Sequence, residues 1–468
     1  MAAEQIPTIE TVVQSFLTDL ASVRSNAVFT GIFIQAVEGI TGQQYKEFTD
    51  ARRDPENPTF LTGLNLAEYK HFLRLQSEHK RAQRGKHIAT RGYMVSLVSQ
   101  YDAFLSGLVR ALFTLQPSLF NGSKRSMEVH EILNFTSIDE LKDSIVDDEI
   151  ESLLRESHIQ QFAWLENKFG LQTLRKDLEI WPAFVEITQR RNLFVHSDGR
   201  VSKQYLKNCQ EQGVSKLDGL AIGAQLEADI SYVRRSADVF YEIAVKLSQV
   251  LWRKVQPRQI EQADLLLNEI AYTLLERKRY KLAVQILDFA FLTLKRHSNN
   301  EAKLRLLINR ANAYRLSGNN QKCLDLISSE DWSATSLQFK LASTLLRGDI
   351  DRAVELMREM GANGEITKDS YRVWPLFEGA RDDERFQKAF AEIFEEDLGA
   401  PPTTKEISEG QLEPQQKAPG LTGAFLLEFL DATDLDVADE FNITVKTNLE
   451  AALEAGSKSG VKSAAKLN

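Results

Sequence analysis

The chain has 468 residues, 43% of them hydrophobic and 26% charged. This excludes wholesale disorder and is enough for about two to four domains. The net charge of -9 excludes nonspecific nucleic-acid binding by the whole surface, so any nucleic-acid site has to be a local basic patch. The two cysteines, Cys209 and Cys323, cannot build a disulfide framework or a cysteine zinc site, and they indicate a reducing compartment.

The N-terminal sequence predicts a cytoplasmic protein. It lacks the basic n-region and apolar h-region of a secretory signal. The longest apolar stretch, residues 27–40, is too short to span a bilayer and contains Gln35, Glu38 and Gly31. We therefore expect a buried core helix at this stretch, and no membrane contact.

Residues 1–87 predict an N-terminal helical extension. Apolar side chains recur at helical spacing over residues 8–54, Pro55 and Pro58 interrupt the pattern, and Asn65 is placed to cap a helix that begins near Ala67. This helix carries a basic stretch, residues 74–91, in which only Glu78 is acidic. The stretch includes Lys80, Arg81, Arg84 and Lys86.

Residues 88–256 predict one helical domain. Its first helix has a broad apolar face, an acidic run at 139–151 lies in the second helical segment, and Pro182 predicts a kink or a helix start. Ser197-Asp198-Gly199 is a strong helix stop. The expected helices cover residues 88–115, 127–170, 174–196 and 225–255.

Residues 257–362 contain an internal repeat of about 34 residues. Small and aromatic residues recur at the spacing of a helix-turn-helix unit, and a small residue is needed where two helices cross closely. They are Ala271, Tyr280, Ala283, Leu287 and Ala290, then Ala311, Tyr314, Gly318, Cys323 and Ile327, and in a looser third copy Gly348, Ala353 and Met357. The pattern resembles tetratricopeptide (TPR) repeats, which implies an α-solenoid that binds a protein partner.

The C-terminal part predicts a cap and a tail. Aromatic residues at helical spacing over 371–398 predict one helix within residues 363–399, which caps the stack with a core face. Residues 400–468 read as a Pro/Gln/Glu/Thr-rich linker and a mobile acidic tail, or a docking peptide around Phe425 to Leu430.

Several kinds of site have no sequence support. The chain contains no phosphate-binding G-x-x-x-x-G-K-[ST] loop, no G-x-G-x-x-G, no H-E-x-x-H and no calcium loop. Its seven histidines are scattered. We therefore expect no cofactor and no bound metal.

The segment that carries candidate chemistry runs from Glu186 to Gly199. It holds Arg191-Asn192 and, four residues after the asparagine, His196, with apolar residues between and a helix stop directly after. Asn192 and His196 are i,i+4 neighbours on one helix face, whereas Arg191 lies about 140° round from His196. For Arg191 and His196 to reach one phosphate, the helix end must unwind or a partner chain must complete the site.

This segment resembles the Arg-x4-6-His motif of HEPN ribonucleases, which favour a polar residue directly after the arginine. The resemblance covers about residues 88–256. It implies a catalytic set of Arg191, Asn192 and His196, metal-independent cleavage of RNA to 2′,3′-cyclic phosphate ends, and a homodimer or larger assembly. It makes Arg190 and the cations Lys80, Arg81, Arg84 and Lys86 candidates for RNA binding.

Plainer interpretations remain beside these. Glu186 is more easily an i,i+4 partner of Arg190 than a catalytic acid, and His196 can simply cap a helix C-terminus. For the basic stretch, a solvated helix face is about as good an explanation as RNA binding. The acidic run is usually solvated too, or it shields the cleft as an RNA mimic.

The sequence thus predicts an all-α protein, a HEPN-like helical bundle followed by a TPR-like α-solenoid. We expect an endoribonuclease of the toxin or antiviral-defence kind, regulated through the TPR-like stack. The alternative is a non-catalytic scaffold that uses an inert HEPN-like dimer and the repeats to bind a protein. A weaker third possibility is a nucleotide-binding module that works with a nucleotidyltransferase on another chain.

Overall fold

The computed structural model describes residues 8–122, 127–171, 174–175, 178–215, 217, 219–294 and 296–399. Within these ranges every regular element is a helix and there is no strand, so the predicted all-α class is confirmed. The described residues form two compact units, and the boundary lies inside helix α8 (Ile230–Val255), between Ala244 and Val245.

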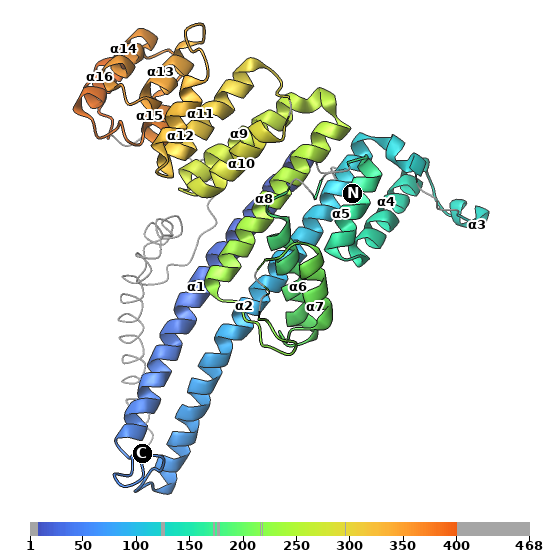
Figure 1. The fold of residues 1–468 in the computed structure, drawn as a ribbon, viewed down its shortest axis with the longest axis vertical. Helices are drawn as coiled ribbons and strands as arrows, with labels where there is room; N and C mark the ends of the chain where they lie inside the picture. The colour runs from blue at the N-terminus through green and yellow to red at the C-terminus, as the bar shows by residue number, and fades with distance from the viewer. Residues whose placement is uncertain are drawn as a thin grey trace, which may run out of the picture. The chain divides into compact units, whose positions relative to one another are not determined.

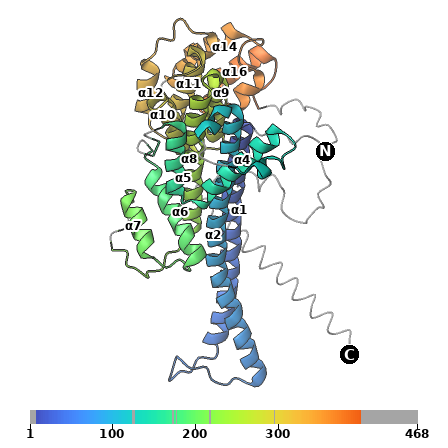
Figure 2. The same cartoon turned by 90° about the vertical axis from the view of Figure 1, so that its right-hand side faces the viewer.

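The first unit is built on a hairpin of two long antiparallel helices, α1 (Ile9–Asp50) and α2 (Leu66–Leu115) (Figure 1). The predicted cap of α2 is confirmed. Asn65 and Glu68 each accept a hydrogen bond from the other's backbone N–H, both at 3.0 Å. Figure 2 shows the turn between α1 and α2 projecting away from the other helices of this unit.

The hairpin changes two details of the sequence prediction. The boundary expected between 1–87 and 88–256 falls inside α2, because Gly85 weakens a helix without breaking it and no proline is present. The stretch 27–40 is the middle of α1 rather than a buried core helix. Only Ala27 and Ile32 in it are buried. Helix α1 packs along α2 and meets α8, where Arg24 pairs with Asp238, but side chains such as Phe33, which is 54% exposed, are not covered.

Helix α1 also bears on the prediction about membranes. By length and composition it is the one helix in the described ranges that could cross a membrane, and little of its apolar segment is buried. The argument from the shortness of stretch 27–40 therefore no longer holds, because the helix around it has 42 residues. The cytoplasmic location stays a prediction.

Helices α5 (His158–Phe169), α6 (Trp181–His196) and α8 pack with α2 around an aromatic core. Tyr101 of α2 packs against Phe184 with ring centroids 5.1 Å apart, and Phe184 packs against Phe240 of α8 at 5.5 Å. All three are buried, so α6 is held against α2 and α8. The other elements are η1 (Pro117–Gly122), α3 (Val129–Ile132), α4 (Ile138–Arg155) and α7 (Lys203–Glu211), the last of which the sequence did not predict.

The second unit contains three successive helix pairs where the repeats were predicted. The small residues Ala271, Ala283, Ala311 and Ala353 are completely buried. This is the position that close helix crossing requires. After η2 (Pro257–Gln259), the pairs are α9 (Ile260–Glu276) with α10 (Tyr280–Leu292), α11 (Asn300–Leu316) with α12 (Asn320–Ser328), and α13 (Leu337–Leu346) with α14 (Ile350–Met360).

The single capping helix expected over 371–398 is wrong. The segment is divided into α15 (Lys368–Val373), η3 (Pro375–Phe377) and α16 (Glu384–Phe394). Pro375 has no backbone N–H and restrains the residue before it, so α15 cannot continue. The predicted core role of the aromatic residues is confirmed, since Phe377, Phe386 and Phe390 are fully buried. The predicted tail, residues 400–468, lies outside the described residues.

Candidate active site

Helix α6 carries the Arg191–His196 segment. Pro182 lies in its first turn, where a missing N–H is tolerated, so this proline starts the helix rather than kinking it. The helix ends at His196. Gly199, with φ +78°, then donates its N–H to the Leu193 carbonyl at 2.9 Å. The predicted stop is therefore confirmed.

The Arg191 side chain turns toward α2. Its Nη2 lies 3.9 Å from Oδ2 of Asp102, and its side chain is 21% exposed. Its Nε is buried without a hydrogen-bond partner. Burial lowers the pKa of the Arg191 guanidinium, and the Asp102 charge opposes this. Arg191 is thus a partly desolvated cation, and its carboxylate neighbour Asp102 is too distant for a hydrogen bond.

Asp102 also contacts a buried histidine. Oδ1 of Asp102 lies 3.0 Å from Nε2 of His158, at the first position of α5. The His158 ring is buried next to Tyr101 and Phe184, with both ring centroids 5.9 Å away. Asp102 therefore joins α5 and α6 to α2, and it is the acidic group nearest to the candidate arginine.

His196 and Asn192 are differently placed. His196 is exposed at the last turn of α6, and Asn192 is half-buried. Neither side chain has a hydrogen-bond partner among the residues that the structure describes. Both are therefore available to a ligand or to a second chain.

The structure does not bring Arg191 and His196 together within one chain. Because α6 stays helical to His196, the two side chains leave the helix about 140° apart. The helix end does not unwind, so one chain does not form a shared site in this way. A shared site would therefore have to be completed by a second chain.

Arg190, predicted to bind RNA, is occupied by contacts within the protein. Its Nε donates to Glu186 at 2.7 Å and its Nη1 to the Glu227 carbonyl at 2.8 Å, while its guanidinium lies 4.2 Å from the Tyr232 ring centroid. Tyr205 and Tyr232 donate their hydroxyls to Glu186 at 2.7 and 2.5 Å. Burial alone would lower the pKa of Arg190, but Tyr232 and Glu186 raise it. The i,i+4 pairing of Glu186 with Arg190 is confirmed, and Arg190 is best described as structural.

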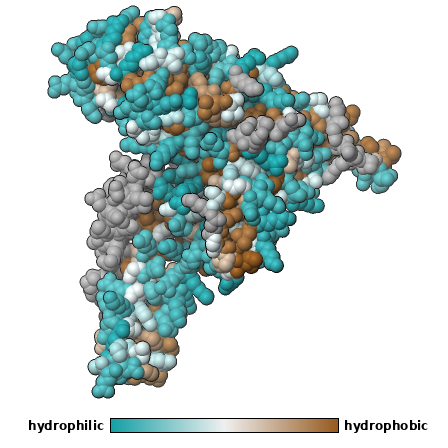
Figure 3. All heavy atoms as spheres, in the orientation of Figure 1, coloured by the Kyte–Doolittle hydropathy of each residue, from teal (hydrophilic) through white to brown (hydrophobic). Residues whose placement is uncertain are grey.

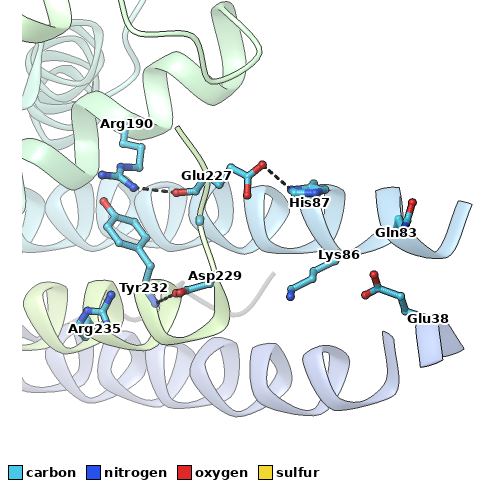
Figure 4. Close-up of a pocket in the computed structure, with 10 residues that line it drawn as sticks. Glu38, Gln83, Lys86, His87, Arg190, Glu227, Asp229, Tyr232 and Arg235 are labelled. Atoms are coloured by element: carbon cyan, nitrogen blue, oxygen red, sulfur yellow. Dashed lines mark hydrogen bonds and ion pairs between the residues drawn. The ribbon is translucent and has the colours of Figure 1, made fainter. Parts of the chain in front are cut away.

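A polar cleft of about 560 Å³ lies beside this network, between the hairpin and α8 (Figure 4). Lys86 points into it from α2 and Arg235 from α8, and neither has an ion-pair partner in the described ranges. His87 lies 3.5 Å from a Glu227 oxygen. The lining residues are Glu38, Gln83, Lys86, His87, Arg190, Glu227, Ala228, Asp229, Tyr232 and Arg235.

The predicted RNA-binding cations of α2 therefore do not form one set. Lys86 lines the cleft, whereas Lys80, Arg81 and Arg84 are exposed on α2 outside it. None of these three has an ion-pair partner among the described residues. They remain available for a polyanion.

Sequence reasoning missed Asp102, His158 and Arg235. Asp102 had a signal, because it is a carboxylate within the apolar face that runs through Tyr101 and Leu105. His158 and Arg235 carry no such signal in the sequence, because the residues that they contact belong to other helices. In the part of the chain that the structure describes, no cluster of three or more His, Cys, Asp or Glu side chains is suited to a metal ion.

Comparisons with known proteins add no family to this geometry. No protein-family model matches the chain, and neither the curated proteins nor the solved structures contain a match.

Proposed function

We propose that this protein is a metal-independent endoribonuclease of the HEPN type, with Arg191, Asn192 and His196 as its catalytic residues. One observation carries the proposal. Helix α6 presents a partly buried guanidinium with an unsatisfied Nε and, five residues on, an exposed histidine that has no hydrogen-bond partner in the described part of the chain. A buried donor left without a partner is unfavourable, and a phosphate oxygen would satisfy it.

The chemistry fits these side chains. A histidine can accept the proton of a ribose 2′-hydroxyl near neutral pH, and that oxygen then attacks the adjacent phosphorus. The bond to the 5′-oxygen breaks as a second acid protonates it, which leaves a 2′,3′-cyclic phosphate and a 5′-hydroxyl. Arg191 stabilises the charge that develops on the phosphoryl oxygens. Asn192, one turn before His196, orients the imidazole or holds a phosphate oxygen.

The proposed active form is a homodimer. Arg191 and His196 diverge by about 140° on one helix, so a composite site needs the Arg191 of one chain beside the His196 of another. Two chains also supply two imidazoles, one as base and one as acid. The three helix pairs of the second unit are proposed to be TPR-like repeats that bind a regulatory protein partner.

A non-catalytic scaffold is the second candidate. The observation that favours it is the same divergence, together with the 3.9 Å contact of Arg191 with Asp102. In this form the α6 residues serve packing, and the helix pairs bind a protein.

The deciding experiment compares cleavage of a labelled RNA oligonucleotide by the wild type, His196→Ala and Arg191→Ala in EDTA, with analysis of the product ends. We expect cyclic phosphate ends from the wild type and a loss of at least about 100-fold in both variants. His71→Ala, which removes an imidazole near the hairpin tip, is the matched control. Cleavage that survives His196→Ala would contradict the site, and no cleavage by purified dimeric wild type would favour the scaffold.

A further inference from the structure

A segment of the first unit carries large apolar side chains that are exposed to solvent. Residues 127–143, here called the arm, comprise α3 and the first part of α4. Val129, Leu133 and Ile138 are 71%, 77% and 71% exposed, and Ile132 is 42% exposed. Figure 3 shows apolar surface at the tip where the arm carries α3. Such clusters mark contact surfaces for other molecules.

The arm is also acidic. Its one basic residue other than a histidine is Lys142, against five carboxylates, namely Glu128, Glu131, Asp139, Glu140 and Asp143. Asp139 is 87% exposed although it pairs with Lys142 at 2.8 Å, and Asp143 has no partner in the described ranges. The partner of the arm should therefore offer apolar side chains and cations close together.

Helix α2 carries a surface of that composition. Exposed residues at three- and four-residue spacing form one stripe along α2, here called the α2 stripe. Its apolar members are Leu66, Tyr69, Leu73 and Ile88, which are 71%, 49%, 43% and 70% exposed. Its cations are Lys80, Arg81 and Arg84, all exposed and without ion-pair partners among the described residues.

The arm cannot reach the α2 stripe of its own chain. Arg110 of α2 forms an ion pair with Asp147, which holds α4 against the C-terminal half of α2. Arg84 and Arg110 are 26 residues apart on one continuous helix, about 39 Å. Asp143 lies only about 6 Å along α4 from Asp147. The stripe that matches the arm is therefore that of a second copy.

We propose that the arm of one copy docks on the α2 stripe of a second copy, with its apolar residues against Leu73 and Ile88 and its carboxylates against Lys80 and Arg84. In a two-fold dimer each chain supplies one arm and one stripe, so the contact forms twice. This contact goes beyond the proposed cleavage and does not depend on it. Because Lys80, Arg81 and Arg84 are also the proposed RNA contacts, RNA and the arm compete for them.

A charge-swap experiment tests the pairing. Lys80→Glu/Arg84→Glu reverses two charges one turn apart on α2, and Asp139→Lys/Asp143→Lys does the same on α4. We expect each variant alone to associate at least about tenfold more weakly than the wild type in sedimentation at low salt. An equimolar mixture should associate again, because one chain's acidic stripe faces the other's basic arm, while the second contact keeps its natural charges.

The outcomes of this experiment distinguish a second copy from RNA as the molecule that binds the α2 stripe. A wild-type chain that stays monomeric at about 100 µM, which corresponds to an affinity of roughly millimolar or weaker, overturns the proposal. So does a mixture of the two variants that fails to associate. If the stripe variant loses RNA binding while self-association is unchanged, RNA alone uses the stripe. His196→Ala should associate like the wild type, so failure of the proposed catalysis and failure of this contact are distinguished. Leu133→Ser is expected to weaken association without changing charge.

Discussion

Asp102 is the residue on which the candidate site depends most. It lies between the buried His158 and the partly buried Arg191, with 3.0 Å to the first and 3.9 Å to the second. A carboxylate there keeps the guanidinium on the α2 side of α6 without neutralising it fully. In the proposed enzyme it is a positioning residue.

Asp102→Asn tests that role. The amide keeps the shape and the contact with His158 but removes the charge that attracts Arg191. We expect kcat for RNA cleavage to fall about 100-fold, since small displacements of a catalytic group have effects of this size, while KM changes much less. Asp102→Glu should recover part of kcat. Equal changes in kcat and KM with a large loss of stability would instead indicate a purely structural residue.

Gly199 supports the end of α6 through its backbone. Its φ is +78°, and a Cβ would meet the Leu226 carbonyl oxygen at 2.8 Å. Gly199→Ala should therefore lower the free energy of unfolding by about 2–4 kcal/mol in urea denaturation. Gly63→Ala is the control, because Gly63 has φ +73° but nothing within 4 Å of its Cβ. That variant should lose about 1 kcal/mol, and equal losses would mean that the contact with Leu226 contributes nothing.

At the scale of elements, the continuity of α2 matters most. One helix carries the apolar face that builds the core around Tyr101 and, several turns earlier, the exposed cations. A rigid helix fixes the distance between the proposed RNA contacts and Asp102. A flexible joint at residue 87 would not.

This arrangement makes the α2 cations testable by salt dependence. If Lys80 and Lys86 each contact a phosphate of single-stranded RNA, Lys80→Ala and Lys86→Ala should each lower the slope of log K against log salt by about 0.7. Lys322→Ala, in the second unit, should leave the slope unchanged. Slopes equal to the wild type in both α2 variants would mean that α2 is a solvated helix face.

At the scale of the whole chain, each unit has its own stabilising contacts. In the second unit Asp264 is buried, and Arg253 donates to it at 2.5 Å, His297 lies 3.0 Å from it, and the Ser298 N–H donates at 2.6 Å. Burial raises the pKa of Asp264, but these partners outweigh it and lower the pKa to about 2. Asp264 lies in α9 and thereby joins the C-terminal half of α8 to the residues directly before α11.

The sign of this shift predicts an acid-dependent loss of stability. Because the folded pKa lies below the ordinary value of 3.8, Asp264 stabilises the folded chain above pH 4, and the effect disappears as the pH falls toward 2. Asp264→Asn should lower stability by about 2 kcal/mol at pH 7 and by little near pH 2. Urea denaturation of the full-length wild type and variant at both pH values measures this difference in the free energy of unfolding. An equal loss at both would mean that packing, not charge, is responsible.

The sequence predicted features that depend on neighbours along the chain. The Asn65 cap, the stop after His196, the buried alanines of the repeats and the Glu186–Arg190 pair all follow from spacings of a few residues, and the structure confirms them. The errors also have local causes. Within 371–398 the aromatic spacing is compatible with one helix, but Pro375 breaks it. The change from basic to apolar residues near 87 suggests a boundary where the backbone simply continues.

By itself, then, the sequence determined the all-α class and most helix ends, because helix periodicity, caps and breakers act through residues three or four apart. Only the tertiary structure decided that Arg191 faces Asp102 while His196 points to solvent. Only the tertiary structure placed Lys86 in the cleft with Arg235, separate from Lys80, Arg81 and Arg84. These contacts join residues far apart in the chain, and which of them meet depends on how α2, α5, α6 and α8 pack around one aromatic core.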